Sequence, residues 1–155
     1  MSLVRLIYVS RIAETCDMEE IEKILKVSRR KNAERDITGM LCYDPTFFMQ
    51  CLEGPKDAVN ELYADIARDG RHTRVTLLEY RDIEDRVFPE WTMAFVRACD
   101  LEPRMLRKYN CRGKFDPFAL NPEQARDLVI EILKHKQEQL EEQKEYEAGG
   151  NCNGG

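Results

Sequence analysis

The order of strand-like and helix-like segments constrains the fold of this chain more than any other feature. Runs rich in β-branched and aromatic residues predict strands at Leu3–Ser10, Ile37–Tyr43, Phe47–Leu52, Val75–Tyr80 and Trp91–Val96. Apolar residues at helical spacing predict one helix between the first two strands and another between the third and the fourth. The order β-α-β-β-α-β-β predicts an α+β, ferredoxin-like fold, in which two helices cover one face of a single sheet.

Both faces of this predicted sheet are apolar. Along the first strand, Leu6 and Tyr8 point to one face, while Ile7 and Val9 point to the other. Two helices cover only one face, so the C-terminal segment, a partner chain or both must cover the second. The C-terminal segment offers an apolar stripe after a helix start at Asn121–Glu123. We therefore expect a core domain at 1–97, a helical cap at 98–146 on the second face, and a disordered tail at 147–155.

Composition argues against several classes of protein. The 155 residues carry 24 Lys and Arg against 29 Asp and Glu, and the net charge of −5 argues against nucleic acid as a partner. No apolar run reaches the roughly 18 residues of a membrane span, and we expect a cytoplasmic protein. The 6 cysteines have no CxxC spacing, and the histidines are His72 and His135. We therefore expect no metal site.

Four polar residues occupy positions where the patterns predict a core. Ser28 and Asn32 continue the apolar face of the first helix, and Tyr8 and Gln50 lie among apolar strand residues. If these faces meet, the side chains form a charge-free, amide-rich pocket, which suits a neutral heterocycle with an alternating donor–acceptor edge, such as a flavin or a pterin. Each residue also has a structural interpretation: a satisfied core glutamine, a packed tyrosine, or an asparagine that helps to end its helix.

Four motifs in register carry a family resemblance. They are RLIYVS at Arg5–Ser10, ITGMLCY at Ile37–Tyr43, FMQCLEGP at Phe48–Pro55 and FPEWTMAF at Phe88–Phe95. With these motifs, residues 3–97 resemble the BLUF domain, the flavin-binding sensor of blue light using FAD. The loop DGRHT at Asp69–Thr73 is also similar to the family's. The extension to about residue 145 resembles the short, single-domain photoreceptors of the PixD type.

The resemblance implies roles for the pocket residues. Tyr8 would donate an electron and a proton to the excited flavin, and Gln50 would bridge Tyr8 to flavin N5 and O4 and change its hydrogen bonds on illumination. Asn32 would bind the pyrimidine edge of the ring. The remaining implied residues are Ser10 and Ser28 as hydrogen-bonding neighbours, Trp91 and Met93 as a relay near Gln50, and Ile24, Leu41, Phe48 and Ile66 as packing around the ring.

Two positions depart from the family pattern. Lys31 stands where Asn or His is frequent, and it either reaches the FAD phosphates or is solvated. Asp36 stands where Gly is frequent, and because Asp tolerates left-handed backbone better than most residues, we expect a modest local cost. The chain has no glycine-rich phosphate motif, so we expect the pyrophosphate near solvent, by Arg71.

The leading hypothesis is a blue-light photoreceptor, not an enzyme, that signals through its fifth strand and C-terminal helices to a downstream protein. A response-regulator-like protein is one candidate partner. We also expect a homo-oligomer, a dimer or larger, because one sheet face needs cover. Two alternatives stay open. One is an acylphosphatase-like enzyme on the same fold, with Arg5 or Arg71 beside Asn32, and the other is an interaction module that has lost its chromophore.

Overall fold

The computed structural model describes residues 2–88, 93–109 and 114–150. The first seven elements follow in the predicted order: β1 (Leu3–Ile12), α1 (Met18–Glu34), β2 (Thr38–Tyr43), β3 (Phe47–Pro55), α2 (Lys56–Arg68), β4 (His72–Ile83) and β5 (Ala94–Arg97). The strands form one sheet in the order β4-β1-β3-β2-β5, in which β2 and β5 are parallel and the other neighbours antiparallel. The predicted ferredoxin-like α+β fold is confirmed.

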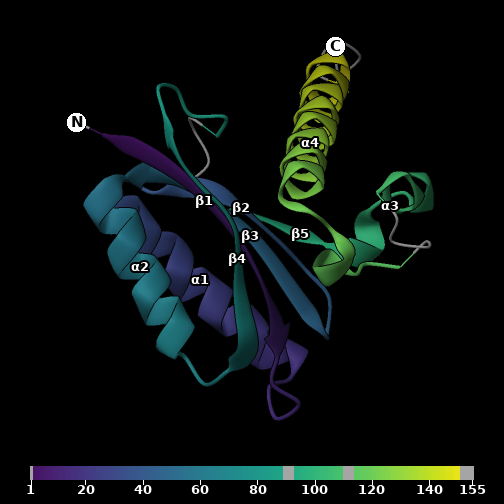
Figure 1. The fold of residues 1–155 in the computed structure, drawn as a ribbon. Coiled ribbons are helices and arrows are strands. Elements are labelled where there is room, and N and C mark those ends of the chain that lie inside the picture. Colours follow the sequence, from purple (N-terminus) through teal and green to yellow (C-terminus); the bar gives the residue numbers. More distant parts are fainter. Residues whose placement is uncertain (1, 89–92, 110–113, 151–155) are drawn as a thin grey trace.

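The sheet has a layer of helices on each side (Figure 1). The helices α1 and α2 cover one face, and α3 (Pro103–Lys108) and α4 (Pro122–Gly150) lie on the other side, with 3₁₀ turns at Ala98–Asp100 and Pro117–Ala119. Two cores result. The pocket-side core includes Leu6, Ile21 and Leu25, and the C-terminal core packs Ile7 and Met49 of the sheet against α3 and α4.

The apolar second face is therefore covered by the same chain. Leu128 and Ile132 of α4 are almost fully buried in the C-terminal core. Burial of each such side chain contributes about 1.5–3 kcal/mol. The prediction of a homo-oligomer rested on an uncovered face, and in the described residues this face is filled by α3 and α4.

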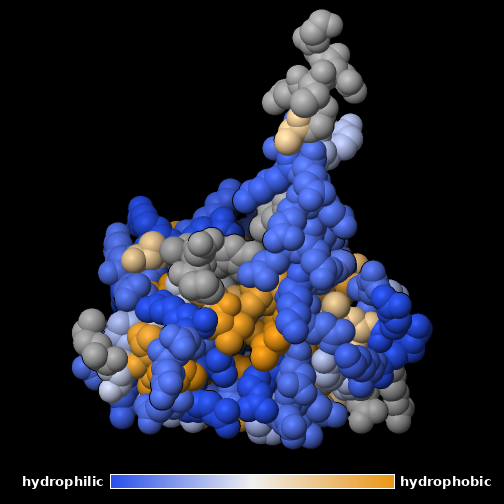
Figure 2. Space-filling view, turned by 90° about the horizontal axis from the view of Figure 1, so that it is seen from above, coloured by the Kyte–Doolittle hydropathy of each residue, from blue (hydrophilic) through white to orange (hydrophobic). Residues whose placement is uncertain are grey.

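Several elements are longer than predicted, β4 most among the strands (His72–Ile83 against Val75–Tyr80), and two further boundaries bear on the site and the C-terminal layer. The strand β5 begins at Ala94 in the described residues, and the predicted start at Trp91 lies in residues 89–92, outside them. The helix α4 runs to Gly150, so residues 147–150, expected in a disordered tail, are helical, while 151–155 are outside the described part. Glu, Gln and Lys have high helix propensity, so the helix continues where the apolar stripe stops. Figure 2 shows the C-terminal half of α4, which projects from the domain, as largely hydrophilic, with apolar side chains near its base.

Asp36 adopts the left-handed backbone conformation that its position was expected to need, with a φ of 57°. Arg86 supports this turn, because its Nη2 donates to the carbonyl oxygen of Asp36 at 2.8 Å and pairs with the carboxylate at 3.1 Å. The non-glycine residue is thus accommodated by contacts from a distant segment.

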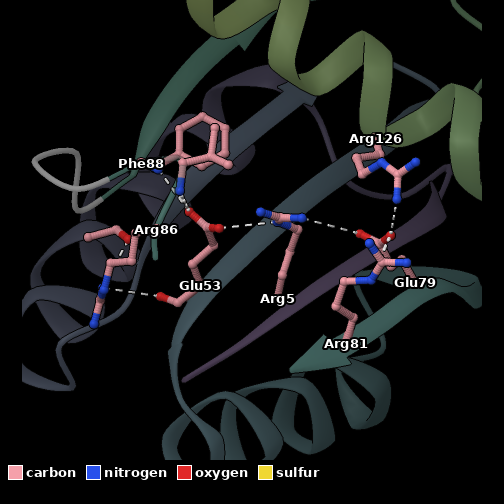
Figure 3. A network of polar contacts seen from close by, with 9 residues as sticks. Arg5, Glu53, Glu79, Arg81, Arg86, Phe88 and Arg126 are labelled. Atoms are coloured by element: carbon pink, nitrogen blue, oxygen red, sulfur yellow. Dashed lines mark hydrogen bonds and ion pairs between the residues drawn. The ribbon is translucent and has the colours of Figure 1, made fainter. Parts of the chain in front are cut away.

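A buried carboxylate holds the segment before residue 89 against the sheet (Figure 3). Glu53, which is fully buried at the end of β3, accepts a hydrogen bond from Arg5 Nε at 3.1 Å. Its other oxygen accepts from the backbone N–H groups of Val87 and Phe88, both at 2.8 Å. Charge-assisted bonds of this kind are stronger than neutral ones.

The same network reaches α4. Arg5 Nη1 lies 3.9 Å from Glu79 Oε2 on β4, and Arg126 Nη1 of α4 lies 3.3 Å from Glu79 Oε1. Figure 3 shows Arg5 between the two carboxylates, with Arg126 reaching down from the helix. The network therefore joins β1, β3, β4 and α4 on the face opposite α1 and α2.

Replacing Glu53 by Ala should lower the free energy of unfolding by about 3–5 kcal/mol, because the Arg5 guanidinium and two amides would remain buried without their acceptor. Urea unfolding of the two proteins measures the difference. Arg126→Ala is the control, because this partly exposed residue should contribute at most about 1 kcal/mol. Equal, small losses for the two variants would contradict the structural role of Glu53.

Candidate functional site

The pocket lies between the sheet and the two helices α1 and α2. Tyr8 of β1 and Gln50 of β3 are directly paired across the two antiparallel strands, so their side chains leave the sheet on the same face. The cavity beside them has a volume of about 210 Å³. All the residues predicted to hold a cofactor line it: Ile24, Ser28, Asn32, Leu41, Phe48, Gln50, Ile66 and Arg71.

A chain of hydrogen bonds runs from the lining of the pocket to the core beside it. Tyr8 Oη donates to Gln50 Oε1, and Gln50 Nε2 donates to Met93 Sδ at 3.5 Å. Tyr8 is 3% exposed and Gln50 6%. Burial raises the pKa of the Tyr8 phenol, with smaller contributions from Tyr63 and Asp69, so the phenol is neutral and donates. A thioether is a weak acceptor, so the amide of Gln50 is held firmly at its oxygen and loosely at its nitrogen.

Asn32 has a buried acceptor that no described residue satisfies. The residue is 1% exposed, and its Oδ1 has no hydrogen-bond partner among the residues the structure describes. The helix continues past it to Glu34, so the side chain does not end the helix. An unsatisfied buried acceptor costs about 1–3 kcal/mol. A ligand N–H at this point in the pocket would remove that cost.

Ser10 contacts a residue that the sequence interpretation left out of the site, His72. The imidazole Nε2 lies 2.7 Å from the carbonyl oxygen of Ile66, which can only accept, so Nε2 carries the hydrogen. Nδ1 is then free of hydrogen and accepts from Ser10 Oγ at 2.9 Å. The His72 ring lies edge-on to the rings of Tyr8 and Phe48, at centroid distances of 6.4 and 6.0 Å. Burial lowers the pKa of His72, in agreement with a neutral ring.

Charged side chains lie among the lining residues at the surface end of the pocket. They are Lys31, Arg35, Asp65, Asp69 and Arg71. Arg71 Nε donates to Asp69 Oδ1 at 2.9 Å, and these hydrogen bonds lower the pKa of Asp69. Arg71 thus lies in the pocket, as predicted, but it is already paired. The DGRHT motif was the sequence signal for both Arg71 and His72, since they are neighbours in it.

The relay residues are placed only in part. Met93 is buried in the pocket-side core and Ala94 in the C-terminal core, so the two residues face opposite sides of the sheet. Trp91 lies outside the described residues.

The alternative of an acylphosphatase-like site with Arg5 beside Asn32 is wrong, because the two side chains lie on opposite faces of the sheet. Arg5 is bound to Glu53 on the α4 side of the sheet, whereas Asn32 lines the pocket on the α1 side. Within the described ranges, no group of three or more His, Cys, Asp or Glu could hold a metal ion, and no helix is long and apolar enough to cross a membrane.

The comparison with protein families gives a match over more than half of the chain. The model of the family BLUF, described as sensors of blue-light using FAD, matches residues 3–94. Photoactivated adenylate cyclase subunit beta of Euglena gracilis is 40% identical over 93 residues, which are 59% of this chain and 11% of that protein. The blue light- and temperature-regulated antirepressor BluF of Escherichia coli strain K12 is 36% identical over 76 residues, 49% of this chain and 19% of that protein. The chain thus spans a small part of these curated relatives.

Two solved structures are similar over more of their length. The photo-activated state of BlsA has a TM-score of 0.77 and 28% sequence identity, and the alignment covers 84% of this chain and 94% of that one. The dark state of BlrB, a BLUF protein, has a TM-score of 0.60 and 34% identity, covering 70% of this chain and 78% of that one. The similarity to BlsA extends past residue 94 into the C-terminal helices, because it covers more of the chain than the family model does.

The neutral state of His72 predicts a pH dependence of stability. Since the folded state depresses its pKa, the unfolded chain binds more protons below a pH of about 6.5, and stability present at neutral pH is lost as the pH falls from there toward the folded-state pKa. Thermal unfolding at a series of pH values measures this loss. In His72→Gln, whose amide can make both hydrogen bonds without titrating, the slope in this range should flatten. An unchanged slope would show that another group causes it.

Proposed function

Because the chain belongs to the BLUF family, the sensors of blue light using FAD, we propose that Tyr8 and Gln50 are its light-responsive pair. The observation that carries the proposal is the hydrogen-bond chain from Tyr8 through Gln50, both in the lining of the pocket, to the buried Met93. The three groups are buried and uncharged, and one bond of the chain is weak. The arrangement can therefore rearrange without exposing a charge.

The residues present fit the flavin ring. The unsatisfied Oδ1 of Asn32 offers an acceptor to a ring N–H, and apolar side chains of Ile24, Leu41 and Ile66 line the remaining surface. The polar atoms deep in the pocket belong to neutral groups, while Lys31 and Arg71 are near the surface, where phosphates remain hydrated. In this proposal Asn32 holds the ring, and Arg71, when it exchanges Asp69 for phosphate, contributes to binding at the mouth.

FAD, held in the pocket, would supply an absorber of blue light that, once excited, is a reversible one-electron acceptor. Tyr8 is the donor in this proposal. A phenol that has lost an electron is a strong acid, so its proton moves along the hydrogen bond from Tyr8 Oη to Gln50 Oε1. When the electron returns, the Gln50 amide gives one proton back to Tyr8, so both side chains are neutral again, and Gln50 is left rotated or tautomerised with a different pattern of donors and acceptors. No net redox change remains after the electron returns, and the changed hydrogen bonds are the signal.

The output of the proposed switch is the strand β5 and the C-terminal helices. Gln50 contacts Met93, and the next residue, Ala94, belongs to the core that α3 and α4 form with the sheet. A change in the contact between Gln50 and Met93 would thus act on the residue next to Ala94, which packs in the opposite layer. The light response would be a shift in the populations of two packings of these helices.

The domain division and the partners follow from this output. We assign residues 1–97 to the sensor and 98–146 to a cap that passes the signal to a downstream protein, without a catalytic activity of its own. The acidic chain, with a net charge of −5, supports a protein partner rather than nucleic acid. The thiols of Cys16, Cys51 and Cys99, which form no disulfide within the described part of the chain, support a cytoplasmic setting. Homo-oligomer formation stays a prediction, which sedimentation in the dark and in the light tests.

Tyr8→Phe should abolish the reversible red shift of flavin absorption, because it removes the proton and the hydrogen bond to Gln50. Gln50→Leu should abolish it too, and both variants should still bind FAD. The measurement is the light-minus-dark absorption spectrum of the purified, FAD-bound proteins. Tyr63→Phe is the matched control, since this ring lies 5.9 Å from that of Tyr8 and should leave the shift intact. A full shift in Tyr8→Phe would overturn the assignment.

Asn32→Ala should weaken FAD binding by about tenfold, the effect of losing a buried hydrogen bond worth near 1.4 kcal/mol. Titration of the FAD-free protein, followed by flavin fluorescence, gives the affinity. The control is Asn60→Ala on the exposed face of α2, which should bind FAD like the unmodified chain. If the two variants bind equally well, Asn32 does not hold the ring.

A further inference from the structure

The strand β5 lies at an edge of the sheet, next to α4 (Figure 1). Among the residues that the structure describes, it pairs with β2 alone, in parallel register, so one of its two sides has no strand neighbour there. The carbonyl groups on that side need other partners, and charged side chains on an edge strand also prevent another strand from adding to it.

Two cationic side chains from opposite layers bind these outward carbonyls. Arg29 of α1 donates to the carbonyl oxygen of Met93, from Nε at 3.2 Å and from Nη2 at 3.1 Å. Lys136 of α4 donates from Nζ to the carbonyl oxygen of Phe95 at 3.0 Å. The segment 93–95 is therefore held from the pocket side by one helix and from the C-terminal side by another.

The same segment also contacts the photoactive pair. Met93 Sδ accepts from Gln50 Nε2, and Phe95 lines the pocket. The guanidinium of Arg29 lies over the Phe95 ring, 4.4 Å from its centroid. One arginine thus fixes the backbone of Met93 and the ring of Phe95 at once. A lysine could not do both, because it lacks the planar fork of nitrogens.

We propose that Arg29 and Lys136 are positioning residues, which hold segment 93–95 against Gln50 and connect it to α4. The connection to α4 deepens the proposed function and rests on it, whereas the hold on Met93 does not. The two cations repel each other, and burial and Arg29 both lower the pKa of Lys136. The hydrogen bonds to the two carbonyl oxygens offset this repulsion. A displacement of Met93 therefore changes the geometry of the Lys136 bond, and through it the position of α4.

The hold on Met93 is tested in the dark. Methionine-methyl NMR spectra of the FAD-bound protein report Met93 directly, and the chain has only 6 methionines. Arg29→Ala and Lys136→Ala should each shift the Met93 signal, and Lys136→Arg, which keeps a donor, should restore it. Arg29→Lys should fail to restore it. The matched controls are Arg30→Ala and Lys134→Ala, which change exposed neighbours on the same helices. A Met93 signal at its unmodified position in both alanine variants, or an equal shift in the controls, would overturn the hold.

The connection to α4 is tested under illumination. Met105 of α3 is buried in the C-terminal core and reports that layer. In the unmodified protein, light should move the signals of both Met93 and Met105. In Lys136→Ala the Met93 response should remain and the Met105 response should be lost. A full Met105 response in that variant, or none in the unmodified protein, would overturn the connection. Absence of any red shift in the unmodified, FAD-bound protein would instead refute the proposed function, and the dark test of the hold would still stand.

Discussion

The hydrogen bond between Tyr8 and Gln50 is the interaction on which the site depends. It exists because β1 and β3 are paired in a register that places these two residues directly opposite each other, and a shift of one residue would turn either side chain to the other face. Both residues are enclosed by apolar side chains, so the bond is protected from water. Protection keeps the phenol neutral and makes the weak contact between Gln50 and Met93 the point at which the chain of bonds can change.

The sheet has packed layers on both faces, and it connects the pocket on one face to the C-terminal helices on the other. A strand presents alternate residues to opposite faces, so β3 carries Gln50 into the pocket and Cys51 into the C-terminal core. On the pocket side the sheet has neutral polar groups, and on the other side it has a buried ion network around Glu53 together with the apolar stripe of α4. The pocket and the C-terminal helices therefore share the same strands, and in the proposed function a small movement of β5 would affect both layers.

The sequence predicted the elements and their order because strands and helices have distinct periodicities, and it predicted the second apolar face from residues such as Ile7 and Val9. Two things were beyond it. The helix α4 continues past its apolar stripe, through a run rich in Glu, Gln and Lys with high helix propensity, and ends at Gly150. The partners of His72 and Arg29 lie as far away as Ser10 and Met93, 62 and 64 residues along the chain. No local pattern encodes such pairs, because they arise from the packing of complete elements.

The most direct test of the central claim is the light-minus-dark infrared difference spectrum of the FAD-bound protein, with and without isotope-labelled glutamine side chains. Gln50 lies in the pocket, while the other glutamines, Gln124, Gln137, Gln139 and Gln143, belong to α4. We predict a side-chain amide band that shifts with the label and disappears in Gln50→Leu. A reversible red shift in the visible spectrum with no glutamine band in the infrared would contradict the account.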